Sequence, residues 1–280
     1  DWVGAEDPMI PDDLRIYLDA ATKLTQRDNL YLQGPVDRME FYQYSPPFAL
    51  FMTVFLWLPR SISAILHTGF HIIAYIFLYI KWFQLFKRWS LHKSLHYLVW
   101  TLPVWLLFSS FWTDLGYLNV YILMALFSTL LIEAVIDENL GQAVLWTSVI
   151  LLIKPQWAFA LTVPFILHRW SFFTKTLAFS VIVYVAISGL TILAVGTDYG
   201  WRQQVDYVQI LRGISSNVYP WRLPSDPFLG YNHSIKQILI YLLDAKQETF
   251  ILTALIKAII SLPLGIVSLQ YLLNSLHSAD

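Results

Sequence analysis

Hydrophobic residues in this chain occur in long runs that polar segments separate. A helix that crosses a bilayer needs about 20 predominantly apolar residues. We predict such spans near 61–80, 97–112, 120–136, 177–195 and 250–273, and a helical hairpin from two shorter runs, 141–153 and 157–168, that meet at Lys154-Pro155. The pattern therefore predicts an all-α fold, a polytopic transmembrane helical bundle that forms a single membrane domain over residues 1–280.

Two further apolar runs, 48–58 and 235–243, are too short to cross a membrane. Proline bounds the first of them, with Pro46 and Pro47 before it and Pro59 after it. We expect both runs to form short surface or re-entrant helices on the outer face.

Two long segments are polar, 1–46 and 196–234. The first contains apolar residues at helical spacing from Leu14 to Leu24, with Asp12 and Asp13 where first-turn acids belong. This spacing predicts an amphipathic helix on the membrane surface. We interpret 196–234 as a polar outer loop.

Basic residues set the predicted orientation. Lys81, Lys87, Arg88 and Lys93 follow the 61–80 run with no acid among them, and such loops face the cytoplasm. Alternation of the spans then places both long polar segments on the extracytoplasmic side of a plasma or inner membrane. The acidic turn Asp137–Asn139 falls on the cytoplasmic side, where it fits the rule poorly.

Composition agrees with a membrane protein and excludes several functions. Of the 280 residues, 57% are hydrophobic and only 13% are charged, about half the share in soluble domains. A net charge of −1 gives no indication of nucleic-acid binding, and the lack of cysteine excludes thiol catalysis and disulfides. The chain begins with Asp1 and shows no signal peptide, so we expect that a removed segment precedes it.

Asp12 and Asp13 are the first candidates for chemistry. Acids at a helix N-terminus often only cap free N–H groups. The functional alternative is a carboxylate at the membrane edge that accepts a proton from an attacking hydroxyl. Both readings remain open from these residues alone.

Lys154 is a sharper signal, because a lysine inside an apolar stretch costs roughly 2.5–3.5 kcal/mol on insertion scales. The side chain either snorkels to the interface or serves as a fixed cation for a phosphate.

Asn119, Asn232 and His233 lie in polar segments next to predicted helices, where they either cap a helix or bind a ligand. Two histidine pairs are spaced four residues apart, at 67 and 71 and at 92 and 96, but no carboxylate lies close to either pair in sequence. We therefore expect no metal site.

The order of short motifs resembles that of the glycosyltransferase-C superfamily, and within it the polyprenyl-phosphate-mannose-dependent α-mannosyltransferases of bacterial envelopes. The matching motifs, spread over roughly 11–260, are Asp13-Leu14-Arg15-Ile16-Tyr17, Tyr44-Ser45-Pro46-Pro47-Phe48, Gly116-Tyr117-Leu118-Asn119, Ile153-Lys154-Pro155 and Asn232-His233-Ser234. Two features differ from the family pattern: no span precedes the first polar segment, and Gly-Tyr-Leu-Asn replaces the commoner Gly-Gln-x-Asn.

The resemblance implies a transferase that moves a hexose, mannose in the nearest branch, from a polyprenyl phosphate to a lipid or glycan acceptor at the outer face. It implies no cofactor beyond that lipid-linked donor. Asp13 corresponds to the catalytic acid, with Asp12 as the alternative. The implied substrate-binding residues are Arg15, Tyr17, Tyr44, Asn119, Lys154, Asn232 and His233.

Two other functions stay open: a non-catalytic membrane subunit or scaffold, within a membrane complex, and a transporter. An enzyme needs Asp12 or Asp13, whereas a scaffold does not. A transporter would place Lys154 at the middle of the bilayer and is typically built from repeats, which the sequence lacks.

Overall fold

The computed structural model describes residues 10–31, 41–215, 235–244 and 246–277. The chain divides into two compact units, 1–210 and 211–280. All regular structure in the described ranges is helical, which confirms the predicted all-α class. The organisation of the chain as one membrane domain stays a prediction.

The first unit contains the following helices: α1 (Asp12–Gln26), α2 (Pro46–Met52), the 3-10 helix η2 (Thr53–Trp57), α3 (Arg60–Arg88), α4 (His92–Trp100), α5 (Leu102–Leu106), α6 (Ser109–Tyr117), α7 (Tyr121–Ile136), α8 (Leu140–Ile153), the 3-10 helix η3 (Pro155–Leu161), α9 (Thr162–Ile166), α10 (Trp170–Val195) and most of α11 (Thr197–Ser215). The second unit contains α12 (Ile235–Leu243) and α13 (Gln247–His277), which pack against each other.

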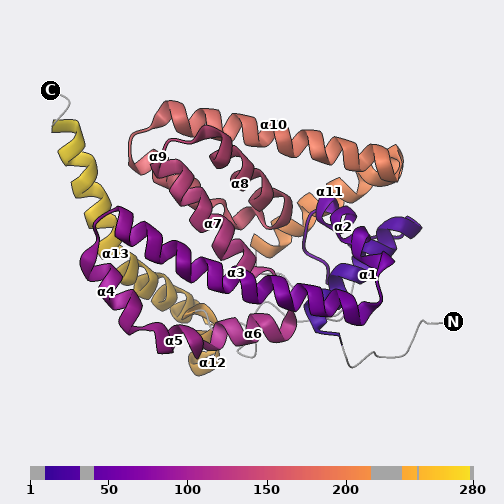
Figure 1. Ribbon diagram of the computed structural model, residues 1–280, viewed down its shortest axis with the longest axis horizontal. Helices are drawn as coiled ribbons and strands as arrows, with labels where there is room; N and C mark the ends of the chain where they lie inside the picture. The colour runs from indigo at the N-terminus through magenta and orange to yellow at the C-terminus, as the bar shows by residue number, and fades with distance from the viewer. Residues whose placement is uncertain (1–9, 32–40, 216–234, 245, 278–280) are drawn as a thin grey trace. The chain divides into compact units, whose positions relative to one another are not determined.

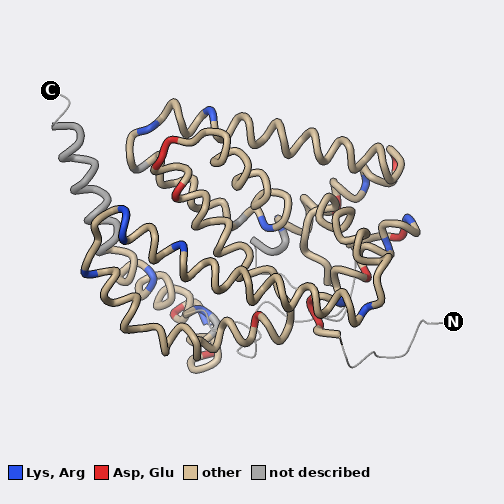
Figure 2. Tube along the Cα trace, in the orientation of Figure 1, with Lys and Arg blue, Asp and Glu red and all other residues tan. Residues whose placement is uncertain are grey.

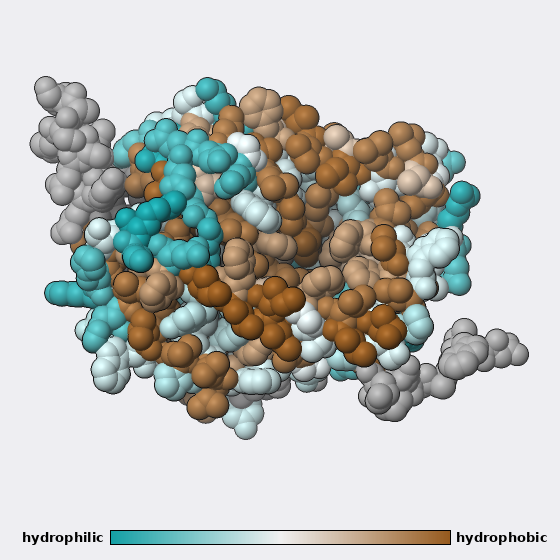
Figure 3. All heavy atoms as spheres, in the orientation of Figure 1, coloured by the Kyte–Doolittle hydropathy of each residue, from teal (hydrophilic) through white to brown (hydrophobic). Residues whose placement is uncertain are grey.

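Four helices of the first unit pack in the order α3, α7, α8, α10 (Figure 1). The inner two, α7 and α8, are apolar on all sides, as buried helices are. The outer two, α3 and α10, expose large apolar side chains such as Ile73 and Leu193, whose exposed fractions are 65% and 68%. Figure 3 shows hydrophobic side chains over much of one face. Contiguous apolar surface of this kind is stable in lipid and unfavourable in water.

Among the described residues, α3 and α10 are long and apolar enough to cross a membrane. A third span results if His92–Trp100 and Leu102–Tyr117, which meet at an angle of 53°, are one broken span. The chain is a membrane protein by this measure. The larger number of crossings predicted from the sequence stays a prediction.

The first predicted span extends further than the apolar run, since α3 continues through Lys81 to Arg88. Ion pairs explain this extension. Lys81 Nζ lies 2.7 Å from Glu133 Oε2, and Arg88 Nη1 lies 2.9 Å from Asp137 Oδ2. Figure 2 shows charges of both signs gathered where α7 ends and α10 begins.

These pairs also account for the acidic turn that fitted the charge rule poorly. Arg169 Nη2 lies 3.3 Å from Glu138 Oε1, and Arg169 Nη1 donates to the carbonyl oxygens of Val135 and Ile136 at the end of α7. The acids therefore neutralise basic residues at the same end of the bundle.

The structure differs from the prediction of a polar loop over 196–234. Its first half is helical, forming α11, and residues 216–234 lie outside the described residues. The polar composition concealed a four-residue spacing of buried side chains at Tyr199, Gln203 and Tyr207. Gln203 Oε1 accepts a hydrogen bond of 2.8 Å from Leu30 N, so α11 packs on the turn that follows α1.

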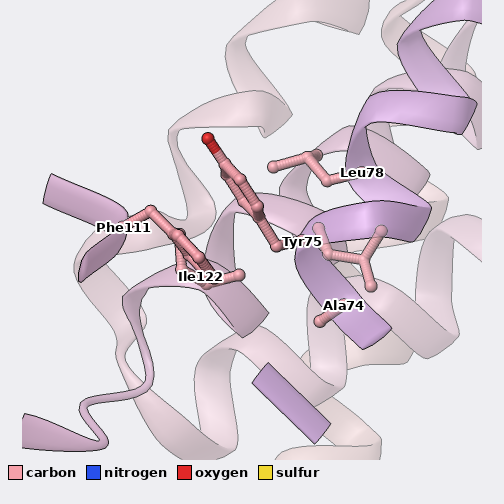
Figure 4. Close-up of a cluster of buried hydrophobic side chains, with 6 residues drawn as sticks. Ala74, Tyr75, Leu78, Phe111 and Ile122 are labelled. Atoms are coloured by element: carbon pink, nitrogen blue, oxygen red, sulfur yellow. The ribbon is translucent and has the colours of Figure 1, made fainter. Parts of the chain in front are cut away.

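A hydrophobic cluster fixes α6 against α3 and α7 (Figure 4). Its buried members are Ala74, Tyr75, Leu78, Phe111, Ile122 and Leu126. The rings of Tyr75 and Phe111 stack with centroids 3.8 Å apart and an interplanar angle of 7°. This packing holds α6, α3 and α7 together around the turn that carries Asn119.

The two ends of α3 allow a test of topology. At its start Arg60 Nη2 lies 3.6 Å from Asp19 Oδ1 of α1, and at its end Arg88 contacts α7. A helix of 29 residues is about 43 Å long, which exceeds the ~30 Å hydrocarbon core. Since the chain has no cysteine, single cysteines at the exposed positions Thr25 and Lys93 can be labelled in intact cells with an impermeant maleimide. We expect labelling at 25 and none at 93 until the membrane is permeabilised; labelling of both from outside would contradict this topology.

Candidate active site

Asp13 is the buried carboxylate of α1. The helix begins at Asp12 after Pro11. Asp13 faces inward, with 9% of the residue exposed, and its Oδ2 accepts a hydrogen bond of 2.7 Å from Asn119 Nδ2. Adjacent helical residues point about 100° apart, so Asp12 and Asp13 lie in different surroundings. Asp12 faces outward and pairs with Arg15 at 3.5 Å.

Asn119 lies in the tight turn between α6 and α7, where Leu118 adopts a left-handed backbone with φ +52°. Asn119 Oδ1 accepts from Val120 N at 2.7 Å and from the Tyr44 hydroxyl at 3.4 Å. Its amide nitrogen is thereby left to donate to Asp13. The surrounding donors thus fix the orientation of the carboxamide.

Two buried tyrosines, Tyr17 and Tyr44, adjoin Asp13 and Asn119. Tyr17 lies one helical turn after Asp13, and its hydroxyl is 2.9 Å from that of Tyr44. Burial raises the pKa of both phenols well above the usual value for tyrosine, and the Asp13 charge raises each pKa further. Both hydroxyls are therefore protonated near neutral pH and remain able to donate.

The Ser-Pro-Pro motif positions Tyr44. Ser45 caps α2, since its Oγ accepts from Phe48 N, and the two prolines occupy the first helical positions, where no N–H is needed. The Ser45 hydroxyl also donates to the Leu152 carbonyl oxygen, two residues before Lys154. The start of α2 is thereby joined to the end of α8.

Lys154 occupies the break between α8 and η3. Its backbone is extended, Pro155 starts the next helix, and only 2% of the residue is exposed. The ammonium lies over two aromatic rings, 4.0 Å from the Tyr121 centroid and 4.8 Å from that of Tyr44. Within the described ranges no carboxylate oxygen lies within 4.0 Å of it, although the charges of Asp13 and Asp114 act on it from further away. Such a cation is held largely by ring faces.

An apolar cavity of about 580 Å³ adjoins this polar cluster. Tyr17, His71, Leu118, Val120 and Ile153 line it next to Asp13, Asn119 and Lys154. Its further walls are apolar side chains of α2, η2, α3, α7 and α8, and several of them, including Phe51 and Phe70, are exposed on the surface that we assign to lipid.

The structure brings together five of the residues predicted from sequence: Asp13, Tyr17, Tyr44, Asn119 and Lys154. Arg15 pairs with Asp12 at the edge, and Asn232 and His233 lie outside the described residues.

The sequence interpretation assigned no site role to Asp114 or Tyr121, and it considered His71 only as part of a histidine pair for a metal. Asp114 and His71 each interrupt an apolar stretch, the same signal that identified Lys154, whereas nothing in the sequence marks Tyr121.

The arrangement combines a buried carboxylate, a fixed cation and an apolar cavity. A carboxylate with one oxygen held by an amide can accept a proton, and a cation can stabilise a departing phosphate. The cluster thus places a proton acceptor and a cation beside one apolar cavity.

Comparison with known proteins identifies the class of reaction. The model of glycosyltransferase family 87 matches residues 42–274, a range that includes Tyr44, Asn119 and Lys154 and begins after Asp13. No curated protein and no solved structure matches the chain. The family agrees with the expected glycosyltransferase-C resemblance and identifies a transferase. The chain belongs to glycosyltransferase family 87 and is a membrane glycosyltransferase.

Proposed function

We propose that this glycosyltransferase moves a hexose, mannose, from a polyprenyl-phosphate donor to a lipid or glycan acceptor at the outer face of the membrane. The observation that carries the proposal is the position of Asp13 and Lys154 in one buried polar cluster beside an apolar cavity. The choice of mannose rests on the resemblance of the motif order to the polyprenyl-phosphate-mannose-dependent enzymes.

Asp13 is the proposed general base. It removes the proton from the acceptor hydroxyl while that oxygen attacks the anomeric carbon of the donor sugar. The bond between the anomeric carbon and the phosphate oxygen breaks, and polyprenyl phosphate leaves with the electron pair. A single displacement of this kind inverts the configuration at the anomeric carbon.

Lys154 is the proposed contact of the donor phosphate. Its ammonium is held over Tyr44 and Tyr121, and cations contribute most to charge stabilisation when they are fixed before the reaction. A phosphate would offer the ammonium charge-assisted hydrogen bonds that ring faces do not provide.

The apolar cavity suits the prenyl chain of the donor. Its volume of about 580 Å³ lies in the range of ligand pockets, and its walls are almost entirely aliphatic and aromatic. The exposed apolar rim at Phe51 and Phe70 would let the chain enter sideways from lipid.

Replacement of the proposed base tests the catalytic assignment. Asp13→Asn keeps the shape and one carbonyl acceptor but cannot take a proton, so we expect transfer to fall by about 10²- to 10⁴-fold. The assay follows mannose transfer from polyprenyl-phosphate [³H]mannose to octyl α-D-mannoside by the full chain in nanodiscs.

The matched control is Asp19→Asn, in the same helix and paired with Arg60, which should retain activity. Asp12→Asn should retain most activity as well, because Asp12 pairs with Arg15, whereas Asp13 is the acid that Asn119 holds. An inactive Asp12→Asn beside an active Asp13→Asn would assign the base to Asp12. Full activity in both would support a non-catalytic role for α1.

Replacement of Lys154 tests donor binding. Loss of a charge-assisted contact costs about 1.5–3 kcal/mol, so Lys154→Ala should weaken binding of polyprenyl-phosphate [³H]mannose by about 10- to 150-fold. Lys154→Arg should retain part of the affinity, since the charge remains. Lys81→Ala, which removes a lysine paired with Glu133, is the control. Equal donor affinity in Lys154→Ala and the native protein would leave Lys154 a structural residue.

A further inference from the structure

Asp114 is a buried carboxylate that the proposed chemistry does not use. Only 5% of the residue is exposed, and it lies in α6, close to the turn that carries Asn119. Asp114 Oδ2 accepts from Ile122 N at 2.9 Å, and the Asp114 carbonyl oxygen accepts from Asn119 N at 3.1 Å. Asp114 thus accepts hydrogen bonds from the turn itself, at Asn119, and from the start of α7, at Ile122.

His71 holds the same turn from α3. Its Nδ1 lies 2.7 Å from the His67 carbonyl oxygen, and its Nε2 contacts the Asn119 carbonyl oxygen. Carbonyl oxygens only accept hydrogen bonds, so both contacts are made together when both ring nitrogens carry a proton. Asp114 Oδ2 lies 3.9 Å from Nε2, within ion-pair distance of a ring that carries both protons.

Capping alone does not account for this pair. Serine or asparagine at position 114 would accept from Ile122 N equally well, without placing a charge in an apolar bundle. Asp114 Oδ1 is also buried and has no hydrogen-bond partner among the described residues. A carboxylate in this place is costly unless the charge itself is used.

Substrate cannot reach Asp114 directly, because its side chain is 3% exposed and that of His71 is 1% exposed. Packing keeps both side chains in place. Tyr75 follows His71 by one turn, Phe111 precedes Asp114 by one turn, and the two rings stack (Figure 4). The printed hydrogen bonds connect Asp114 to the reacting carboxylate through Asn119.

We propose that Asp114 and His71 form a charged clamp that sets the position of Asn119 and, through its amide, the orientation of the Asp13 carboxylate. Asp114 and His71 are positioning residues in this scheme, and the scheme rests on the proposed role of Asp13 as the base. The clamp fixes the backbone of Asn119 on one side, while the side chain of Asn119 donates to Asp13 on the other.

The test is Asp114→Asn in the full chain, since asparagine keeps an acceptor for Ile122 N and removes the charge. We expect kcat to fall on the order of 10²-fold, as small misplacements of reacting groups do. The KM for polyprenyl-phosphate [³H]mannose should change much less than kcat, because Asp114 does not line the cavity and its charge acts on Lys154 only from beyond ion-pair distance. Asp137→Asn, which removes an acid paired with Arg88 at the other end of α7, is the matched control and should keep native kcat.

A double-mutant cycle identifies the route. If Asp114 acts through Asn119, then Asp114→Asn should cause little further loss in an Asn119→Ala background. If the kcat losses of Asp114→Asn and Asn119→Ala multiply in the double variant, the two residues act independently and the clamp is wrong. His71→Gln should reproduce the kcat loss of Asp114→Asn and also raise the donor KM, because His71 lines the cavity as well. Failure of both variants to fold would assign the pair a structural role instead.

Two results separate this proposal from the proposed function. An active Asp13→Asn would contradict the assignment of Asp13 as the base. An inactive Asp13→Asn with a fully active Asp114→Asn would contradict only the clamp.

A structure of the Asp114→Asn variant tests the clamp without any substrate. The distance from Asn119 Nδ2 to Asp13 Oδ2, 2.7 Å in the native protein, should open beyond hydrogen-bonding range. An unchanged distance between Asn119 Nδ2 and Asp13 Oδ2 would contradict the proposal that Asp114 and His71 act as a clamp.

Discussion

The hydrogen bond from Asn119 to Asp13 is the interaction on which the polar cluster depends. It joins α1, a helix of the N-terminal polar segment, to the turn between α6 and α7. Without it the carboxylate would be buried beside tyrosines with one oxygen less well satisfied, and burial of a poorly solvated charge is strongly unfavourable. Tyr44 and Val120 orient Asn119, Tyr17 contacts the Tyr44 hydroxyl, and Lys154 balances the charge of Asp13.

The general constraint behind this arrangement is that charge inside an apolar bundle must be matched locally. The protein meets it in two ways. At one end of α3 and α7, Lys81 and Arg88 pair directly with Glu133 and Asp137. At the cluster the Asp13 carboxylate accepts from the Asn119 amide, and the Lys154 ammonium lies over two ring faces. The two ends of the bundle thus stabilise charge with different kinds of neighbour.

Sequence alone predicted the helical class, the positions of most helices and five members of the cluster, because long apolar runs and interrupting charges are local signals. It did not predict α11, because polar residues hid the spacing of Tyr199, Gln203 and Tyr207. The roles of Asp114 and His71 depend on contacts with residues eight and 48 positions away along the chain. No local pattern encodes such contacts, so the structure was needed to find them.

Helix α3 contacts α1 through Arg60, the Asn119 turn through His71 and α7 through Arg88. With 29 residues it is longer than the hydrocarbon core of a typical bilayer, and long helices adjust to a thinner bilayer by tilting. A change of tilt would move the His71 ring relative to the turn that it contacts. We therefore expect the geometry around Asp13 to respond to the lipid chain length of the surrounding membrane.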